Sequence, residues 1–426
     1  MAQPLNGIPK PVPAGGGVPT VYRARRVVPV ASPPIDDGAV AVRNGAIEAV
    51  GPFGETATGY PDGAVCDLGE VVLLPGLVNA HTHLDNSAMR SRAPRGAGFI
   101  PWIEALLQAK DEIPPETRRK ATAAACRGLP ALGTIAVGDI SPSAFSPPLL
   151  ASQPLWGQVF IEVTGFGRAN GEAGLSKADQ TLRQIESQYG GGRFRFAVTP
   201  HSLYSTHRIL VRAILSRNAD TGRLSSLHLA ESPAEVRFLA GESERFAEVI
   251  RRWGYWEEGW QVPLLRPLGY LDKLGGLRPG VLAVHCVQLS GEEIEHLALS
   301  GCAVCLCPRS NDYIGVGQPR VADLLAAGVK PCLGTDGLGS VETLSLFDEM
   351  AFVRQRHPGV EPAALLRMAT VNGARALRID GRFGSLAPER IGRFLAYAGD
   401  EVGDPLEALT SGIDHSKLFW VGGEVA

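Results

Sequence analysis

Short apolar runs recur eight times through the middle of this 426-residue chain, and their spacing limits the folds open to it. Strand-like runs that alternate with helical segments predict a parallel sheet, and eight such strands close into a TIM-type (β/α)8 barrel. A doubly wound sheet also alternates, but the Gly-x-Gly-x-x-Gly phosphate signature is missing after the first run. The runs are residues 72–83, 134–139, 159–164, 194–199, 225–230, 281–287, 303–307 and 331–335. Helical periodicity falls at 103–110, 116–129, 177–188, 208–216, 292–299 and 321–327.

Both ends of the chain have β patterns instead. The turn Asn44-Gly45 separates two strand-like runs near the N-terminus, and residues 394–397 and 418–421 are strand-like as well. We therefore expect an α/β chain in which a barrel is flanked by a small β-sandwich built from both ends. The expected parts are a flexible Pro- and Gly-rich arm at 1–20, a sandwich at 21–74 plus 384–426, and a barrel at 75–383.

One insertion, residues 241–280, interrupts the barrel pattern between the fifth and sixth strands. It carries Trp253, Tyr255, Trp256 and Trp260, and we expect helices over the barrel mouth. Aromatic side chains at such a place form either a small satellite core or a substrate lid, and the sequence favours neither.

Charge and composition narrow the class of partner. The 41 basic and 44 acidic residues give a formal net charge of −3, which favours a small-molecule substrate over nucleic acid or a membrane. No apolar run approaches the ~18 residues of a membrane span. Seven cysteines without the apolar core of an export signal predict a reducing, cytoplasmic compartment. The sequence does not determine the oligomeric state, and a homo-oligomer is one possibility.

Histidines and acids stand where barrel strands end. In His81-Thr-His83 both imidazoles face one side of the strand, because strand side chains alternate with period 2. His228, Glu231, His285 and Asp336 fall at later strand ends. Any one of them alone is explained more simply as a satisfied polar residue. Together they predict one site, because the C-terminal strand ends of such a barrel build its active site.

Six stretches of the chain resemble the amidohydrolase superfamily, specifically its deaminase branch. The strands around Asn44-Gly-Ala-Ile47 also look like that family's small β-sandwich, whereas residues 384–397 lack its usual Ala-Asp-Leu return. The stretches, in the family's order, are Leu74-Pro-Gly-Leu-Val-Asn-Ala-His-Thr-His-Leu84, Thr199-Pro-His-Ser-Leu-Tyr204, His228-Leu-Ala-Glu-Ser232, Val284-His-Cys286, Cys307-Pro-Arg-Ser-Asn311 and Gly334-Thr-Asp-Gly337.

The resemblance implies a metal-dependent hydrolase that acts on C–N bonds. It implies one divalent ion, Zn2+ with Fe2+ or Mn2+ as alternatives. Glu231 matches the proton shuttle, and His285 matches the residue that orients the attacked group. His201 matches a position that touches substrate. The implied ligands are His81, His83, His228 and Asp336, the last of which also takes the proton of the attacking water.

The lysines limit the number of ions. Binuclear relatives bridge two ions with a carbamylated lysine at the end of the fourth strand, and residues 193–201 hold no lysine. One ion is therefore expected. Glu162, on the third strand, is expected to contact substrate, with a carboxylate bridge between two ions as the alternative.

Within the deaminase branch the chain most resembles the aminodeoxyfutalosine deaminases of menaquinone biosynthesis, on His81-Thr-His-Leu-Asp85, Phe99-Ile-Pro-Trp-Ile103 and Cys307-Pro-Arg-Ser-Asn311. This implies conversion of 6-amino-6-deoxyfutalosine to futalosine and ammonia. Arg309 is expected to pair with a substrate carboxylate, since a guanidinium suits that planar partner, and Asn311 is expected to bind substrate too.

The sequence leaves two other classes of function open. The first is another hydrolase on this barrel, acting on guanine, S-adenosylhomocysteine, a triazine or a cyclic amide. The second is a binding protein without activity, which would have no need of a proton shuttle at Glu231.

Overall fold

The computed structural model describes residues 17–252, 256–258, 260–399 and 403–423. The chain divides into two compact units, Met1–Val78 with Leu129–Ala136 and Ser345–Ala426, and Asn79–Gly128 with Val137–Leu344. Residues 1–16 of the predicted arm lie outside the described part of the chain, as do Trp253 and Tyr255 of the predicted insertion.

Eight strands make two four-stranded sheets, with the orders β6-β7-β8-β9 and β10-β11-β12-β13. Two isolated parallel bridges, Thr82 with Asp336 and Ser202 with His228, join the edges of these sheets. The predicted barrel-type α/β fold is confirmed. The strands are β6 (Leu77–Thr82), β7 (Thr134–Ile140), β8 (Trp156–Val163), β9 (Phe194–Pro200), β10 (Ser225–Leu229), β11 (Val281–His285), β12 (Ala303–Leu306) and β13 (Cys332–Leu333).

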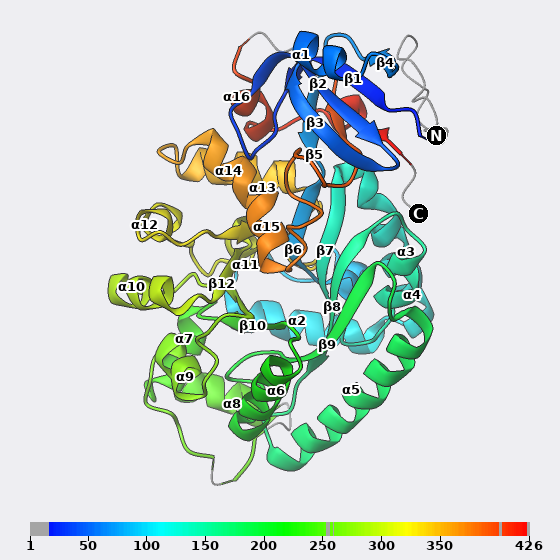
Figure 1. Cartoon of the computed structure of the whole chain (residues 1–426). Coiled ribbons are helices and arrows are strands. Elements are labelled where there is room, and N and C mark those ends of the chain that lie inside the picture. The colour runs from blue at the N-terminus through cyan, green and yellow to red at the C-terminus, as the bar shows by residue number, and fades with distance from the viewer. Residues whose placement is uncertain (1–16, 253–255, 259, 400–402, 424–426) are drawn as a thin grey trace. The chain divides into compact units, whose positions relative to one another are not determined.

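Burial explains why these strands lack polar alternation. β7, β10 and β11 are buried along their whole length, as expected for parallel strands with both faces covered. The long helix α5 (Arg168–Tyr189) packs on β8 and β9, and α6 (Arg208–Asp220) packs on β9 (Figure 1). Other helices of this unit are α2 (Phe99–Glu112), α3 (Pro115–Gly128), α4 (Ser146–Ala151), α7 (Pro233–Leu239), α8 (Glu244–Arg252), α9 (Pro267–Lys273), α10 (Gly291–Ser300), α11 (Pro308–Ile314) and α12 (Val321–Ala326), with the 3-10 turn η1 (Leu84–Met89).

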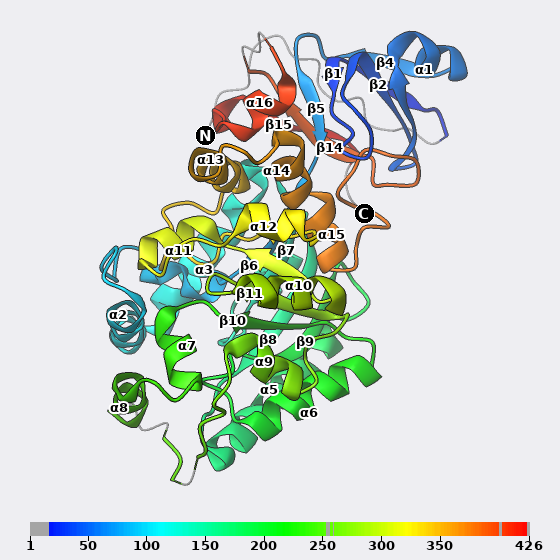
Figure 2. The ribbon, with the colours of Figure 1, turned by 90° about the vertical axis from the view of Figure 1, so that its left-hand side faces the viewer.

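The other unit contains a seven-stranded sheet from both chain ends. Its order is β15-β14-β5-β1-β2-β3, with β4 paired to β1, and Figure 2 shows the blue and red strands together. Tyr22 and Phe394, from the two ends, meet edge to face in its core with ring centroids 5.6 Å apart. The strands are β1 (Thr20–Val27), β2 (Ile35–Arg43), β3 (Ala46–Pro52), β4 (Ala64–Asp67), β5 (Val72–Pro75), β14 (Arg393–Tyr397) and β15 (Leu418–Gly422).

Some boundaries differ from the sequence-based expectation. The apolar run 72–83 is two strands, β5 and β6, which separate at Gly76. A Cβ there would lie 2.7 Å from the Ile135 side chain and 2.8 Å from Trp420, so glycine is required. The pattern also missed helices after the last barrel strand: α13 (Leu346–Arg356), α14 (Pro362–Met368) and α15 (Val371–Ala376). No described helix has the length and apolar character needed to cross a bilayer.

Candidate active site

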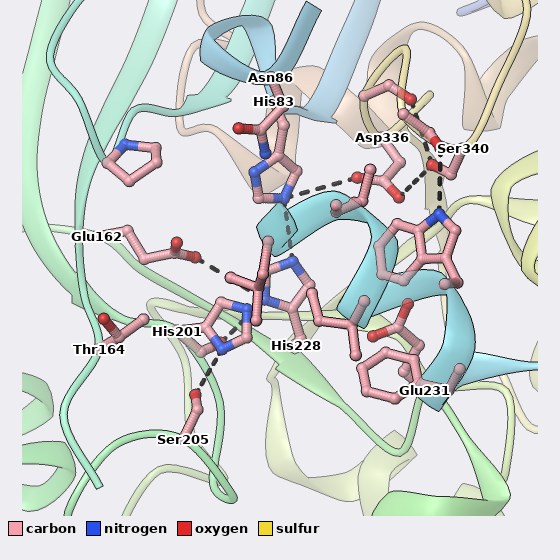
Figure 3. Close-up of a pocket in the computed structure, with 18 of the residues that line it drawn as sticks. His83, Asn86, Glu162, Thr164, His201, Ser205, His228, Glu231, Asp336 and Ser340 are labelled. Carbon is pink, nitrogen blue, oxygen red and sulfur yellow. Dashed lines mark hydrogen bonds and ion pairs between the residues drawn. The ribbon is translucent and has the colours of Figure 1, made fainter. Parts of the chain in front are cut away.

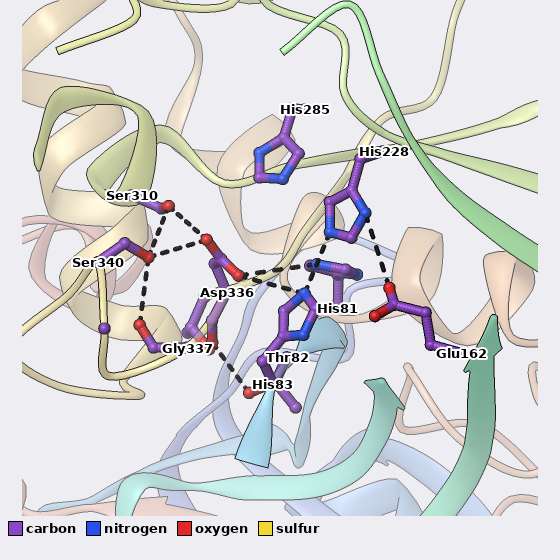
Figure 4. Close-up of polar contacts among 12 residues, drawn as sticks. His81, Thr82, His83, Glu162, His228, His285, Ser310, Asp336, Gly337 and Ser340 are labelled. Carbon is purple, nitrogen blue, oxygen red and sulfur yellow. Dashed lines mark hydrogen bonds and ion pairs between the residues drawn. The ribbon is translucent and has the colours of Figure 1, made fainter. Parts of the chain in front are cut away.

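Three imidazoles and one carboxylate from distant parts of the sequence meet at the strand ends (Figure 4). His83 Nε2 lies 3.1 Å from His228 Nε2 and 3.6 Å from Asp336 Oδ1, and His81 Nε2 lies 3.9 Å from the same oxygen. Donors about 2.1 Å from one tetrahedral ion lie roughly 3.4 Å from each other. Donor atoms of His81, His83 and Asp336 lie within 4.8 Å of one another and could hold one cation, and His228 Nε2 lies next to His83 Nε2.

Backbone contacts between β6 and the segment after β13 bring these groups together. The amides of Thr335 and Asp336 both donate to the carbonyl of His81, at 3.0 and 3.1 Å. The two segments approach so closely at Gly334 that a Cβ there would lie 2.7 Å from the His81 carbonyl oxygen. Asp336 itself has a φ of 58°, a left-handed conformation that is uncommon outside glycine. Such strain is typical of functional sites.

Asp336 is held as a carboxylate with one oxygen free for a cation. Ser310 Oγ and Ser340 Oγ donate to Oδ2, at 2.5 and 2.8 Å. Burial alone would raise the pKa of Asp336. The imidazoles of His83 and His285 and the Ser310 hydrogen bond outweigh it, so the pKa is lowered. Oδ1 is thereby left facing the imidazoles.

The imidazoles of the proposed ligands are neutral, and several of their ring nitrogens have no hydrogen-bond partner among the described residues. Burial, followed by the neighbouring imidazoles, lowers the pKa of His81 well below its usual range, and burial lowers that of His83 to about 4. Neither ring nitrogen of His81 has a hydrogen-bond partner among the described residues. His228 Nδ1 lies 2.9 Å from the carbonyl of His201, which directs Nε2 to the centre. Neutral imidazoles with free lone pairs and one carboxylate fit a divalent zinc-like ion.

Glu231 and His285 form a second pair beside the ligands. Glu231 Oε1 lies 3.6 Å from His285 Nε2. Burial, together with the charges of Asp336 and Glu235, raises the pKa of Glu231 well above its usual range, and burial lowers that of His285 to about 3. Glu235 fixes the turn after β10 by accepting from the amides of Ala230 and Glu231, at 3.1 and 2.8 Å. A protonated carboxyl next to a neutral imidazole suits proton transfer.

These groups open into one cavity of about 320 Å3 (Figure 3), a volume within the usual range for small-molecule pockets. His201 and Glu162 line it, and their contact with substrate stays a prediction. Glu162 Oε1 lies 4.0 Å from His228 Nδ1, and burial raises the pKa of Glu162 to about 8. His201 Nδ1 bonds to Ser205 Oγ at 2.5 Å, which leaves its other nitrogen for the cavity.

Arg309 and Asn311 occupy other places than expected. Arg309 donates to the carbonyl and hydroxyl of Thr343 and pairs with Glu342 at 3.1 Å, and it is not among the residues that line the cavity. Asn311 is buried, and its Nδ2 lies 3.1 Å from His285 Nδ1. Neither residue is among those that line the cavity, and their contact with substrate stays a prediction. Asn311 instead leaves the ring hydrogen of His285 on Nε2, facing Glu231.

The aromatic insertion packs against the cavity wall. Phe166 lines the cavity, and the rings of Trp260 and Trp256 lie 4.7 and 5.7 Å from it. Ile250 of α8 lines the cavity directly, and Phe246 packs 5.1 Å from the ring of Tyr204. The insertion is thus both an aromatic cluster and part of the binding wall.

Sequence reasoning missed one wall of the cavity, formed by α2. Its Trp102 donates from Nε1 to the carbonyl of Gly339, at 3.1 Å, and this ties the helix to the loop after Asp336. Helical spacing could have shown the wall in advance. The α2 residues that line the cavity share one helix face and are Phe99, Trp102, Ile103, Leu106, Leu107 and Lys110.

Similarity to known proteins points in the same direction. The model of the amidohydrolase family matches residues 72–421. The aminodeoxyfutalosine deaminase of Deinococcus radiodurans is 31% identical over 358 residues, 80% of this chain and 81% of that protein. A 5-methylthioadenosine/S-adenosylhomocysteine deaminase of Syntrophobacter fumaroxidans is 30% identical over 372 residues, 84% of this chain and 78% of that protein.

Solved structures share the fold over nearly the whole chain. A Xanthomonas campestris adenosine deaminase with bound zinc matches with a TM-score of 0.78 and 25% identity, over 94% of this chain and 90% of that one. The Helicobacter pylori aminofutalosine deaminase in complex with methylthio-coformycin matches with a TM-score of 0.83 and 22% identity, over 92% of this chain and 95% of that one.

Proposed function

This chain belongs to the amidohydrolase family and is a hydrolase that acts on C–N bonds, and from that premise we propose that it deaminates a purine nucleoside with the help of one divalent metal ion. The observation that carries the proposal is the convergence of His83, His228 and Asp336 beside the Glu231–His285 pair in a single cavity. A protein that only bound a nucleoside would have no need of this pair.

The metal would be held by His81, His83, His228 and Asp336. Zn2+ is favoured by the three imidazoles and one carboxylate, with Fe2+ and Mn2+ as alternatives. When bound, a divalent ion supplies Lewis-acid chemistry that can lower the pKa of water from ~15.7 to near 7.

The protein's own groups then move the protons. Asp336 takes one proton from the attacking water as its oxygen adds to C6 of the purine. Glu231, protonated because of its raised pKa, gives its proton to N1, and His285 Nε2–H donates a hydrogen bond to the new hydroxyl. Glu231 next carries the hydroxyl proton to the amino group. The C6–N bond breaks, ammonia and the 6-oxo purine leave, and the proton on Asp336 returns through solvent to Glu231, which restores both groups.

We propose 6-amino-6-deoxyfutalosine as the substrate, with futalosine and ammonia as products, in menaquinone biosynthesis. The Deinococcus radiodurans relative supports this choice. A second candidate is deamination of 5-methylthioadenosine or S-adenosylhomocysteine, because relatives of that description are 29–31% identical to this chain. The cytoplasm is the proposed compartment, since all seven cysteines are buried and none of them forms a disulfide.

Ammonia release tests the proposal. The purified, zinc-loaded enzyme is offered 6-amino-6-deoxyfutalosine, 5-methylthioadenosine, S-adenosylhomocysteine, adenosine and guanine. We expect the first to have the highest kcat/KM, and metal analysis to find one ion per chain. Faster turnover of guanine would contradict the choice of nucleoside. No ammonia from any of the five would contradict deamination of purines.

A further inference from the structure

Lys110 stands out among the residues of the cavity. Of the described residues that line it, Lys110 contributes the single lysine or arginine side chain. It ends the face of α2 that begins at Phe99, and eleven residues of helix span about 16 Å. The side chains between them on this face are apolar. A ligand lying along α2 therefore meets an apolar wall that ends in one cation.

The charge of Lys110 reaches the cavity as well as the solvent. Although Lys110 is exposed, its ammonium acts electrostatically on the partly buried residues Glu162 and His201, both of which line the cavity. Within the described part of the chain, no ion pair within 4.0 Å joins Lys110 to Glu162, whose carboxylate lies 4.0 Å from His228 instead. The ammonium is thus available to an incoming anion.

The other candidate for that task is already engaged. Arg309 is tied to Thr343 and Glu342 outside the cavity. An ammonium is a compact point charge with three donors, and a carboxylate that binds it gains charge-assisted hydrogen bonds.

We propose that Lys110 binds a carboxylate on the substrate, so that the preferred substrate class is an anionic purine nucleoside. This anion-site proposal rests on the proposed deamination. It narrows the choice of substrate, because 6-amino-6-deoxyfutalosine carries a benzoate whereas 5-methylthioadenosine is uncharged. The apolar face of α2 from Phe99 to Leu107 packs against the uncharged part of the same molecule.

The test compares two substrates in variants of the zinc-loaded enzyme. We expect Lys110→Met to lower the ratio of kcat/KM for 6-amino-6-deoxyfutalosine over 5-methylthioadenosine by at least about 10-fold, the effect of losing one charge-assisted hydrogen bond. Lys110→Arg should restore most of that ratio. Lys120→Met, at an exposed position on α3, is the matched control and should leave the ratio unchanged. An equal fall for both substrates, or a ratio within twofold of the wild type, would overturn the proposal.

Binding of products separates this proposal from the proposed function. Calorimetry gives Kd for futalosine, which is anionic, and for inosine, which is neutral. Lys110→Met should weaken futalosine about 10-fold or more and inosine less than twofold. If the wild type releases no ammonia, but Lys110→Met still weakens futalosine binding more than inosine binding, the proposed deamination is wrong and the anion site is supported. If the wild type deaminates both 6-amino-6-deoxyfutalosine and 5-methylthioadenosine, and Lys110→Met binds futalosine as tightly as the wild type, only the proposed anion site is wrong.

Discussion

Two serine hydroxyls decide which oxygen of Asp336 is offered to a metal. Ser310 and Ser340 both donate to Oδ2, and Oδ1 alone faces His83 and His81. Contacts of this kind orient a ligand and hold its charge.

Removal of one of these hydroxyls should weaken metal binding. We expect Ser310→Ala to lower zinc affinity about 10-fold, because the carboxylate then loses a donor and rotates more freely. Competition with a chromophoric chelator measures it. Ser187→Ala, on the exposed part of α5, is the control. Equal affinities in the two variants would show that Ser310 does not position the ligand.

Substitution of Glu231 should change catalysis without changing metal binding. Glu231→Gln keeps the shape of the side chain but cannot shuttle a proton, so kcat should fall by about 10²–10⁴. Zinc content should stay at the wild-type level, because Glu231 is not among the four ligands. Retained turnover would exclude Glu231 as the shuttle, and lost zinc would instead indicate a ligand.

Glu162 should make the stability of the metal-free protein depend on pH. Burial raises its pKa to about 8, so the folded state keeps a proton that the unfolded chain loses near its ordinary value of 4.5. Any stabilisation from this group is therefore full below pH 4.5 and is lost as the pH rises through 8. Glu162→Gln should gain stability relative to the wild type between pH 5 and pH 8.5, as measured by urea unfolding without metal. A difference that does not change with pH would contradict the raised pKa.

At the scale of elements, the contact between β6 and β13 depends on one glycine. Gly334→Ala would place a methyl group 2.7 Å from the His81 carbonyl and 2.9 Å from Cys305 Sγ. We expect lower thermal stability and a loss of zinc, because His81 and Asp336 move apart. Gly269→Ala is the matched control. Gly269 lies inside α9 with open space around it, so alanine there should stabilise by up to ~1 kcal/mol. A Gly334→Ala variant as stable and as well metallated as wild type would contradict this.

How far the elements could be predicted follows from the same contacts. Hydrophobic runs located the barrel strands, because buried parallel strands are apolar along their length. They did not show that β5 and β6 part at Gly76, since that depends on Ile135, distant in sequence. The motifs around His81, His228 and Asp336 marked strand ends correctly. The contacts of Arg309 could not be predicted, because Glu342 and Thr343 are distant in sequence and lie next to it only in the folded chain.

At the scale of the whole molecule, the proposed metal ligands come from both four-stranded sheets. His81 belongs to β6 in one, whereas His228 belongs to β10 in the other. A bound ion should therefore stabilise the fold, by ~4 kcal/mol at a free concentration 1,000 times its Kd. Chelation should lower Tm, and added zinc should restore it. Glu231→Gln should show the same shift and Asp336→Asn a smaller one. An identical Tm with and without zinc would contradict a shared ion.

The bridge between Thr82 and Asp336 has a consequence for how the enzyme matures. The two residues are 254 positions apart, and the Thr82 hydroxyl bonds to the Asp336 carbonyl only when both are present. A ribosome that has made His81 and His83 still lacks the last donor for most of the remaining synthesis. We therefore expect the proposed metal site to be completed only after Asp336 has been synthesised, so that the metal would be acquired late.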